Sequence, residues 1–236
     1  MDLLTKIAQA FQHGGFWMWP ILLIQVASLA IMAERIYALF MRKKMNQTEF
    51  ALTFEEPIRR GEMESVIKKA QEASATNAVA SAIVAGATAA KNLGGKEEIQ
   101  GKMDEALMLE NARLDHRVAF LSMFGNVATL TGLLGTITGM IKSFAAVAFA
   151  NPAEKASLLS AGISEAMYAT AYGLVVAIPA LVAFAYLQNR ATRLAEDLNQ
   201  GGLKIFNWLS YSYEPMTSYQ IKTTVQKTER APEVNA

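Results

Sequence analysis

The sequence contains no cysteine, and only two of its 236 residues are histidine. Without cysteine the chain cannot form disulfides, zinc–thiolate sites or a thiol nucleophile. His13 and His116 are far apart and outside the long apolar runs, so neither indicates a metal site or a proton relay. A Walker loop, an HExxH motif, paired catalytic carboxylates and a nucleophile triad are also missing. We therefore expect no enzyme, no cofactor and no bound metal.

A strong net charge is missing as well, because 22 basic and 21 acidic residues leave a formal charge of +1. This balance gives no reason to expect a nucleic-acid partner. Apolar residues are abundant instead: 52% of the chain is hydrophobic, and these residues are concentrated in long blocks. The composition therefore predicts a membrane protein.

Residues 15–40 form the first apolar block and are predicted to be the first transmembrane helix. Phe16, Trp17 and Trp19 form an aromatic cluster typical of the headgroup level, and about 20 residues suffice to cross the hydrocarbon core. The basic residues at 42–44 mark the cytoplasmic end of this span. Before it, residues 1–14 predict a periplasmic amphipathic helix; they lack the features of a signal peptide, so we expect the first span to be retained.

Residues 41–118 are rich in charge and predict a cytoplasmic helical domain. We expect amphipathic helices at Glu49–Arg59, Glu62–Ala73 and Glu97–Arg117. Ala78–Ala90 is uncharged, but its 13 residues, mostly alanine, are too short and too weakly apolar to span a bilayer. This segment is predicted to be a buried helix of the same domain.

Two further transmembrane helices are predicted at 119–149 and 158–187, joined by a periplasmic turn at 150–157. A cytoplasmic helix at 188–210 and a disordered tail at 211–236 follow. Twelve basic residues lie in 41–117 and six after Leu187, so 18 of the 22 fall on one side. The positive-inside rule then places the amino terminus outside and the carboxyl terminus inside. The predicted fold is an all-α integral membrane protein whose three transmembrane helices extend into a cytoplasmic helical bundle.

Small residues recur along the second and third spans at helical spacing. Such stripes let two helices approach closely in a membrane, so we assign them to helix packing. The members we single out are Gly132, Gly135, Gly139 and Gly173. Pro179 removes one backbone hydrogen bond from the third span and predicts a kink toward its cytoplasmic half.

Polar residues within these two spans are the candidates for function, because charge at membrane depth is costly. Counted from the outer helix ends, Lys142 and Glu165 both lie about 10 Å deep, and Thr136 and Thr170 about 18–20 Å deep. Glu165 is predicted to line a polar path, with Lys142 as its candidate ion-pair partner. The alternatives are that Lys142 extends to the outer interface, and that each threonine bonds only its own helix backbone.

At these residues the chain resembles the MotA/TolQ/ExbB proton-channel family, and within it the three-span ExbB and TolQ branch. Residues 132–144, Gly-Leu-Leu-Gly-Thr-Ile-Thr-Gly-Met-Ile-Lys-Ser-Phe, are similar to one family motif. Residues 162–180, Gly-Ile-Ser-Glu-Ala through Ala-Thr-Ala-Tyr-Gly to Ile-Pro-Ala, are similar to a second. Glu34-Arg35 after the first span also fits.

The resemblance implies a homopentameric ring in the bacterial inner membrane, with a single-span ExbD- or TolR-like partner inside the pore. Thr136 and Thr170 would then be pore-lining residues and Glu165 the pore carboxylate. Proton flow would drive mechanical work, and a TonB- or TolA-like periplasm-spanning protein is a further candidate partner in that work. The process served could be nutrient uptake, envelope maintenance or motility.

The chain departs from the family pattern at two positions. Thr138 stands where tryptophan is common, and Lys142 where a neutral polar residue or histidine is frequent. Two other functions stay open at this point: a passive membrane scaffold, and a motor subunit driven by sodium rather than protons.

Overall fold

The computed structural model describes residues 15–42 and 46–211. All regular elements in these residues are helices, and three helical stretches are long and apolar enough to cross a membrane: Met18–Phe40, Lys96–Phe149 and Lys155–Tyr211. The predicted helical fold with three apolar helices is therefore confirmed. The predicted helix at 1–14 and the predicted tail after Tyr211 lie outside the described residues.

The helices fall into two compact units. Within the described residues the first unit comprises 15–38 and Asp115–Arg190; it contains α2 (Met18–Ile36), α8 (Val118–Phe149) and the first part of α9 (Lys155–Tyr211). The described residues of the second unit are 39–42, 46–114 and 191–211. Its elements are most of the π-helix η1 (Tyr37–Arg42), α3 (Gln47–Leu52), α4 (Glu55–Arg59), α5 (Met63–Ala73), α6 (Val79–Lys91), α7 (Lys96–Asp115) and the rest of α9.

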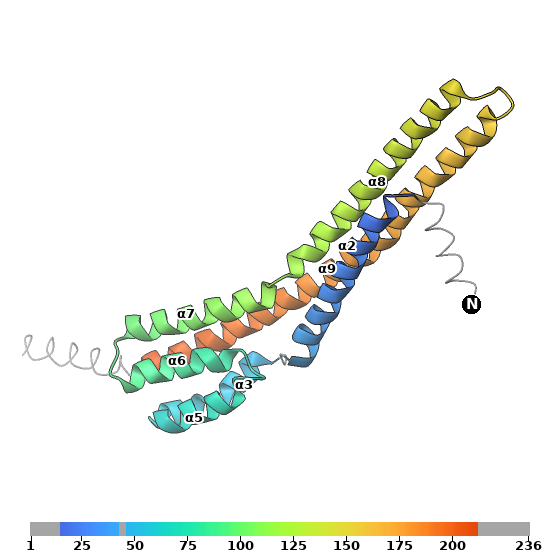
Figure 1. The fold of residues 1–236 in the computed structure, drawn as a ribbon. Coiled ribbons are helices and arrows are strands. Elements are labelled where there is room, and N and C mark those ends of the chain that lie inside the picture. The colour runs from blue at the N-terminus through green and yellow to red at the C-terminus, as the bar shows by residue number, and fades with distance from the viewer. Residues whose placement is uncertain (1–14, 43–45, 212–236) are drawn as a thin grey trace, which may run out of the picture. The chain divides into compact units, whose positions relative to one another are not determined.

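In the first unit, α8 and α9 form an antiparallel hairpin, and α2 lies along it (Figure 1). The turn between α8 and α9 is shorter than the predicted 150–157, because α9 already begins at Lys155. The carbonyl of Asn151 accepts hydrogen bonds from the amides of Glu154 and Lys155, at 2.9 and 3.2 Å, which closes the turn. The predicted third span and the predicted cytoplasmic helix after it are one continuous helix, α9.

In the second unit, α6 is the buried helix that the uncharged segment Ala78–Ala90 predicts. Eight of its residues are buried: Val79, Ala80, Ala82, Ile83, Gly86, Ala87, Ala89 and Ala90. Because alanine has a small side chain and glycine has none, the neighbouring helices α7 and α9 pack close to the backbone of α6. A methyl group at Gly86 would lie 2.6 Å from the Met103 sulfur of α7 and 2.9 Å from a Leu209 methyl carbon of α9.

The predicted helix Glu49–Arg59 is wrong as a single element, because the structure divides it into α3 and α4. Pro57 is the cause: it has no amide hydrogen and its ring clashes with the carbonyl four residues earlier, at Thr53. The Thr53 hydroxyl bonds the Phe50 carbonyl at 2.7 Å, which supports the break. Pro57 is then accommodated in the first turn of the new helix, where proline is tolerated.

Asp197 of α9 holds the beginning of α3. Its carboxylate accepts hydrogen bonds from the backbone amides of Gln47, at 2.5 Å, and Thr48, at 3.1 Å. The side chain of Asn46, the residue before α3, makes no such capping bond. Gln47 in turn is buried, and its side-chain oxygen accepts a 3.0 Å bond from the Val79 amide at the start of α6. Asp197 therefore caps α3, and the Gln47 side chain bonds the start of α6.

Replacing Asp197 with alanine is expected to destabilise the protein by about 1–3 kcal/mol. This is the range for leaving part-buried amide donors without a charged acceptor. Thermal unfolding of the detergent-solubilised chain measures the loss. Glu196→Ala is the matched control, since its neighbouring side chain is exposed on the same helix. Equal melting temperatures for the two variants would contradict the capping role of Asp197.

Candidate functional site

The α8–α9 hairpin is held together by very close backbone contact at Gly132 and Gly173. A methyl group on Gly173 would lie 2.8 Å from the Ala128 carbonyl oxygen and 3.2 Å from the Gly132 Cα. A methyl group on Gly132 would lie 3.0 Å from the Ala169 carbonyl oxygen. Only glycine fits at this crossing, because each obstructing atom belongs to the opposite backbone.

The same close approach continues toward the turn of the hairpin. A methyl group on Gly135 would lie 2.6 Å from the Ala169 side chain, and one on Gly139 would lie 2.9 Å from the Ala166 side chain. The helices are therefore paired residue by residue along the small stripes. This pairing fixes which polar side chains of α8 and α9 lie at the same level.

Thr136 and Thr170 lie opposite each other in this interface, and their hydroxyl oxygens are hydrogen-bonded. Thr170 also donates to the carbonyl oxygen of Gly132 on the other helix, at 2.9 Å. Thr136 bonds the same carbonyl at 3.3 Å within its own helix. Both side chains are half-buried. The three oxygens form one polar cluster, in which Thr170 bonds the opposite helix.

Glu165 lies five residues before Thr170 on α9, which corresponds to about 7–8 Å along the helix. The side chain is half-buried. Its carboxylate faces the beginning of α2: a methyl group built on Gly15 would lie 2.0 Å from Glu165 Oε1. The structure thus brings Glu165 next to the first span.

Lys142 is exposed on α8, and within the described residues no ion pair joins it to Glu165. Its neighbour Ser143 faces α9, because a methyl group on Gly162 would collide with the Ser143 hydroxyl. This register keeps Lys142 and Glu165 at similar levels of the hairpin, as helix counting predicts. Their pairing stays a prediction, which a double-mutant cycle between positions 142 and 165 tests.

Pro179 is an exposed residue within α9, and the helix continues through it. Proline lacks an amide hydrogen, so the carbonyl of Val175 loses its usual helical partner. The kink predicted here stays a prediction.

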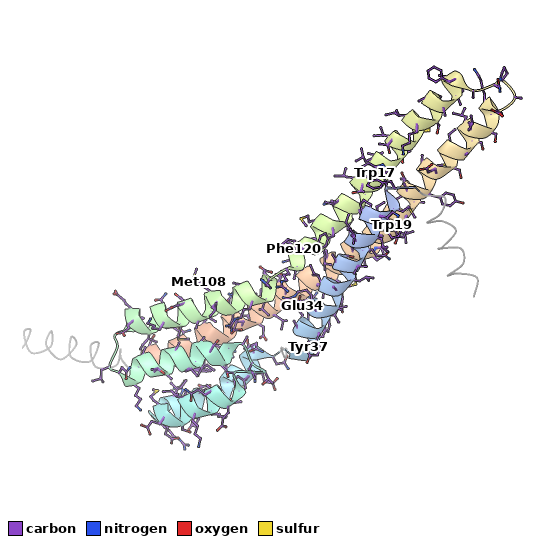
Figure 2. All side chains as sticks on the ribbon, in the orientation of Figure 1. Trp17, Trp19, Glu34, Tyr37, Met108 and Phe120 are labelled. Atoms are coloured by element: carbon purple, nitrogen blue, oxygen red, sulfur yellow. The ribbon has the colours of Figure 1, made fainter. Side chains whose placement is uncertain are left out.

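The aromatic end of α2 lies beside the polar cluster. Figure 2 labels Trp17 and Trp19 at this end of α2, and Glu34 and Tyr37 toward the other end. A methyl group on Gly135, the residue before Thr136, would lie 3.3 Å from the Trp17 Cβ atom. Thr136 and Thr170 are therefore level with the beginning of α2.

Two polar residues that sequence reasoning missed join α2 to α9. The Tyr172 hydroxyl donates a hydrogen bond to the side-chain oxygen of Gln25. Around this bond Ile21, Ala128 and Val176 form a buried apolar cluster. The available signal was Gln25 itself, since a polar side chain in the middle of a predicted span is a candidate for a specific contact.

A second set of polar contacts lies at the other end of α2. Glu34 bonds Arg35 at 2.8 Å and Arg117 at 2.9 Å. Arg117 is the left-handed residue, with φ of 63°, that separates α7 from α8. Asp115 accepts a 3.2 Å bond from the Gln188 side chain of α9. These contacts connect the ends of the three helices within the first unit.

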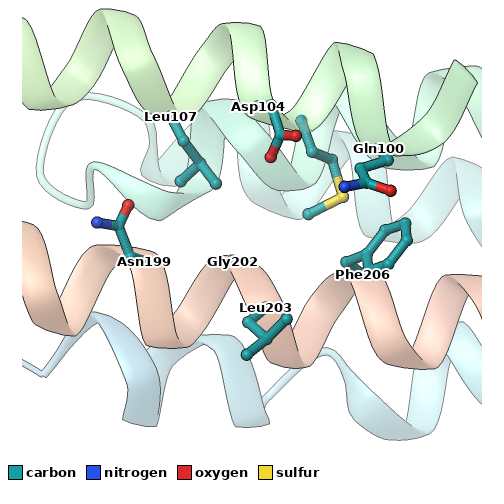
Figure 3. A pocket seen from close by; sticks show the side chains of 8 residues that line it. Gln100, Asp104, Leu107, Asn199, Gly202, Leu203 and Phe206 are labelled. Atoms are coloured by element: carbon teal, nitrogen blue, oxygen red, sulfur yellow. The ribbon is translucent and has the colours of Figure 1, made fainter. Parts of the chain in front are cut away.

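The second unit contains a pocket of about 350 Å³ between α7 and α9 (Figure 3). It is lined by Gln100, Met103, Asp104, Leu107, Asn199, Gly202, Leu203 and Phe206. Asp104 is the only titratable side chain among these lining residues, so the pocket offers no acid–base pair. The described residues also contain no group of three or more His, Cys, Asp or Glu that could hold a metal ion. The polar cluster of the hairpin is therefore the better candidate site.

Comparison with known proteins places these features in a family. A model of the MotA/TolQ/ExbB proton channel family matches residues 32–200. The Tol-Pal system protein TolQ of Haemophilus influenzae is 34% identical over 116 residues, which cover 49% of this chain and 45% of that protein. The biopolymer transport protein ExbB of Pseudomonas putida is 33% identical over 91 residues, or 39% of this chain and 27% of that protein.

A longer match joins the chain to the putative biopolymer transport protein ExbB-like 1 of Synechocystis. The two are 27% identical over 184 residues, which cover 77% of this chain and 70% of that protein. By contrast, the matches to the TolQ and ExbB proteins above span less than half the length of those relatives. The family model itself covers well over half of the chain, including all of α8 and the polar cluster. The chain thus belongs to the MotA/TolQ/ExbB proton channel family.

Proposed function

We propose that the chain is the ring-forming subunit of a proton-driven motor in the bacterial inner membrane. The observation that supports this most is the polar cluster of Thr136, Thr170 and the Gly132 carbonyl, with Glu165 about 7–8 Å further along α9. Hydroxyl and carbonyl oxygens can coordinate water or a hydrated ion, and a carboxylate can bind and release a proton. A helix pair that serves only as a scaffold has no need of these groups.

Within this proposal the chain forms a homopentamer around a single-span partner of the ExbD or TolR type. Hydroxyls that line a pore can solvate ions. In this proposal Glu165 is the one proton-binding carboxylate that the chain contributes to the path. The partner would carry the second proton-binding carboxylate, and its motion relative to the ring would do work on the periplasm. TonB-type uptake, Tol-Pal maintenance and motility are the candidate processes.

The test is proton uptake into vesicles that contain the chain together with its single-span partner, followed with an internal pH-sensitive dye. We expect uptake only when both proteins are present. Thr170→Val keeps the side-chain shape and removes the hydroxyl. If that hydroxyl stabilises the passing ion by about 1–2 kcal/mol, uptake falls roughly 5- to 30-fold.

Thr131→Val is the matched control on α8, because the Thr131 side chain is half-buried like that of Thr170, but its hydroxyl bonds the Val127 carbonyl of its own helix, at 2.7 Å. Its uptake should equal that of the unmodified chain. A passive scaffold would show no partner-dependent uptake and no difference between the two valine variants. Replacing protons with sodium as the only gradient identifies the coupling ion.

A further inference from the structure

The carboxylate of Glu165 belongs to the stripe of α9 that faces α2. Ala169, Tyr172 and Val176 follow it at steps of three or four residues, which places all four on one helix face. Tyr172 bonds Gln25 of α2, and Val176 packs in the cluster that contains Ile21. Glu165 is the outermost polar member of this stripe, so its surroundings depend on how α2 begins.

Gly15 occupies the position directly opposite Glu165. Its φ of +67° is a left-handed conformation that residues with a side chain rarely adopt. A methyl group at this position would lie 2.0 Å from Glu165 Oε1, 3.0 Å from its Cδ and 3.4 Å from its Cγ. The carboxylate therefore fills the space that a side chain at residue 15 would need.

The beginning of α2 also suits a carboxylate electrostatically. The first amides of a helix have no acceptor within the helix, and its amino-terminal end carries a partial positive charge. Gly15 lies three residues before Met18, where α2 begins. A carboxylate held against this end is in a favourable field.

We propose that Gly15 is a positioning residue for Glu165. The backbone before α2, which carries no side chain at Gly15, contacts the carboxylate and holds it beside the ion path. This rests on the proposed function for Glu165. The first span thereby acts on the path without contributing a side chain to it, and a side chain at residue 15 displaces the carboxylate.

The first experiment compares Gly15→Ala with Gly61→Ala in the partner-dependent proton uptake assay. Gly61 also has a positive φ, of +77°, but nothing lies within 4 Å of a methyl group there, so it reproduces the backbone strain without the contact. We expect uptake to fall about ten- to a hundredfold in Gly15→Ala, the cost of misplacing a reacting group by about 1 Å, and to stay unchanged in Gly61→Ala. Equal uptake in the two variants would overturn the proposal.

Rescue distinguishes a displaced carboxylate from a damaged fold. Aspartate is one methylene shorter than glutamate, so Glu165→Asp withdraws the carboxylate from residue 15. We expect the double variant Gly15→Ala/Glu165→Asp to lose less uptake, relative to Glu165→Asp alone, than Gly15→Ala loses relative to the unmodified chain. Equal losses of uptake in the unmodified and the Glu165→Asp backgrounds would contradict the positioning role of Gly15.

A second experiment measures the contact without any assay of flux, and it uses the absence of native cysteine. Gly15→Cys/Glu165→Cys should form a disulfide within one chain when membranes are oxidised with copper phenanthroline. Gly15→Cys/Leu158→Cys is the control: Leu158 lies seven residues away on the same side of α9, about 10 Å along the helix. Equal cross-linking in the two pairs, or cross-links only between chains, would overturn the proposed contact between residues 15 and 165. If Glu165→Gln leaves uptake intact, the proposed function fails, while the cross-link still decides the contact.

Discussion

Exchanging Glu165 for glutamine is expected to abolish proton uptake, by at least about a hundredfold, while the protein still assembles at normal levels. Glutamine has nearly the same shape, so the packing beside Gly15 is retained. It cannot take up or release a proton in the working range, and proton transfer by a positioned group contributes about 10²–10⁴-fold. Partner-dependent uptake in vesicles, normalised to the amount of assembled complex, measures the effect.

The matched control for this variant is Glu154→Gln. Glu154 is exposed, immediately before the start of α9, and its exchange removes the same charge from the same hairpin. Uptake in the control should stay within about twofold of the unmodified chain, since removing an exposed charge usually changes local energies by less than 0.5 kcal/mol. If Glu165→Gln transports as well as this control, Glu165 has no role in the ion path.

The hairpin and its polar cluster could be predicted from the sequence because α8 and α9 are joined by a short turn. A short connection fixes the register of two antiparallel helices, so counting residues from the turn pairs Thr136 with Thr170. The structure adds their mutual hydrogen bond and the shared acceptor on Gly132. These details depend on side-chain rotamers, which residue spacing does not determine.

The position of α2 could not be predicted in the same way, because no short turn ties it to the hairpin. Its level is set by side-chain fit, chiefly the Gln25–Tyr172 bond and the packing of Ile21. Counting residues along α8 and α9 does not relate the aromatic residues of α2 to the tip of the hairpin. The contact of Trp17 with Gly135 shows that α8 continues about 20 Å beyond the aromatic end of α2.

In the second unit, too, features caused by nearby residues could be predicted from the sequence, and features caused by long-range contacts could not. The break between α3 and α4 follows from Pro57, and could have been predicted from that residue alone. The capping of α3 by Asp197 joins residues about 150 positions apart, and no pattern along the chain indicates it. Composition did predict α6 as a buried helix, since a run of alanine is apolar enough to be buried but too short to span.

Replacing Gly173 with leucine is expected to disrupt the hairpin and, with it, the proposed ion path. Even the first carbon of the new side chain would lie 2.8 Å from the Ala128 carbonyl oxygen and 3.2 Å from the Gly132 Cα. Both obstacles are backbone atoms, which cannot move aside without separating α8 from α9. Overpacking a tight interface costs about 1–3 kcal/mol or more, so the melting temperature of the solubilised protein should fall by several degrees.

Gly101→Leu provides the matched control, because Gly101 is also within a helix and nothing lies within 4 Å of a methyl group there. Leucine favours the helical conformation over glycine by up to about 1 kcal/mol, so this variant should melt at the same temperature or slightly higher. The two identical exchanges thus differ in their effect on stability: Gly173→Leu lowers it, and Gly101→Leu leaves it unchanged or raises it slightly. Separation of the helices would also pull Thr170 away from Gly132, so proton uptake by Gly173→Leu should be lost even at temperatures where the protein is folded. Normal uptake in a stably folded Gly173→Leu variant would show that the path does not depend on the close approach of α8 and α9.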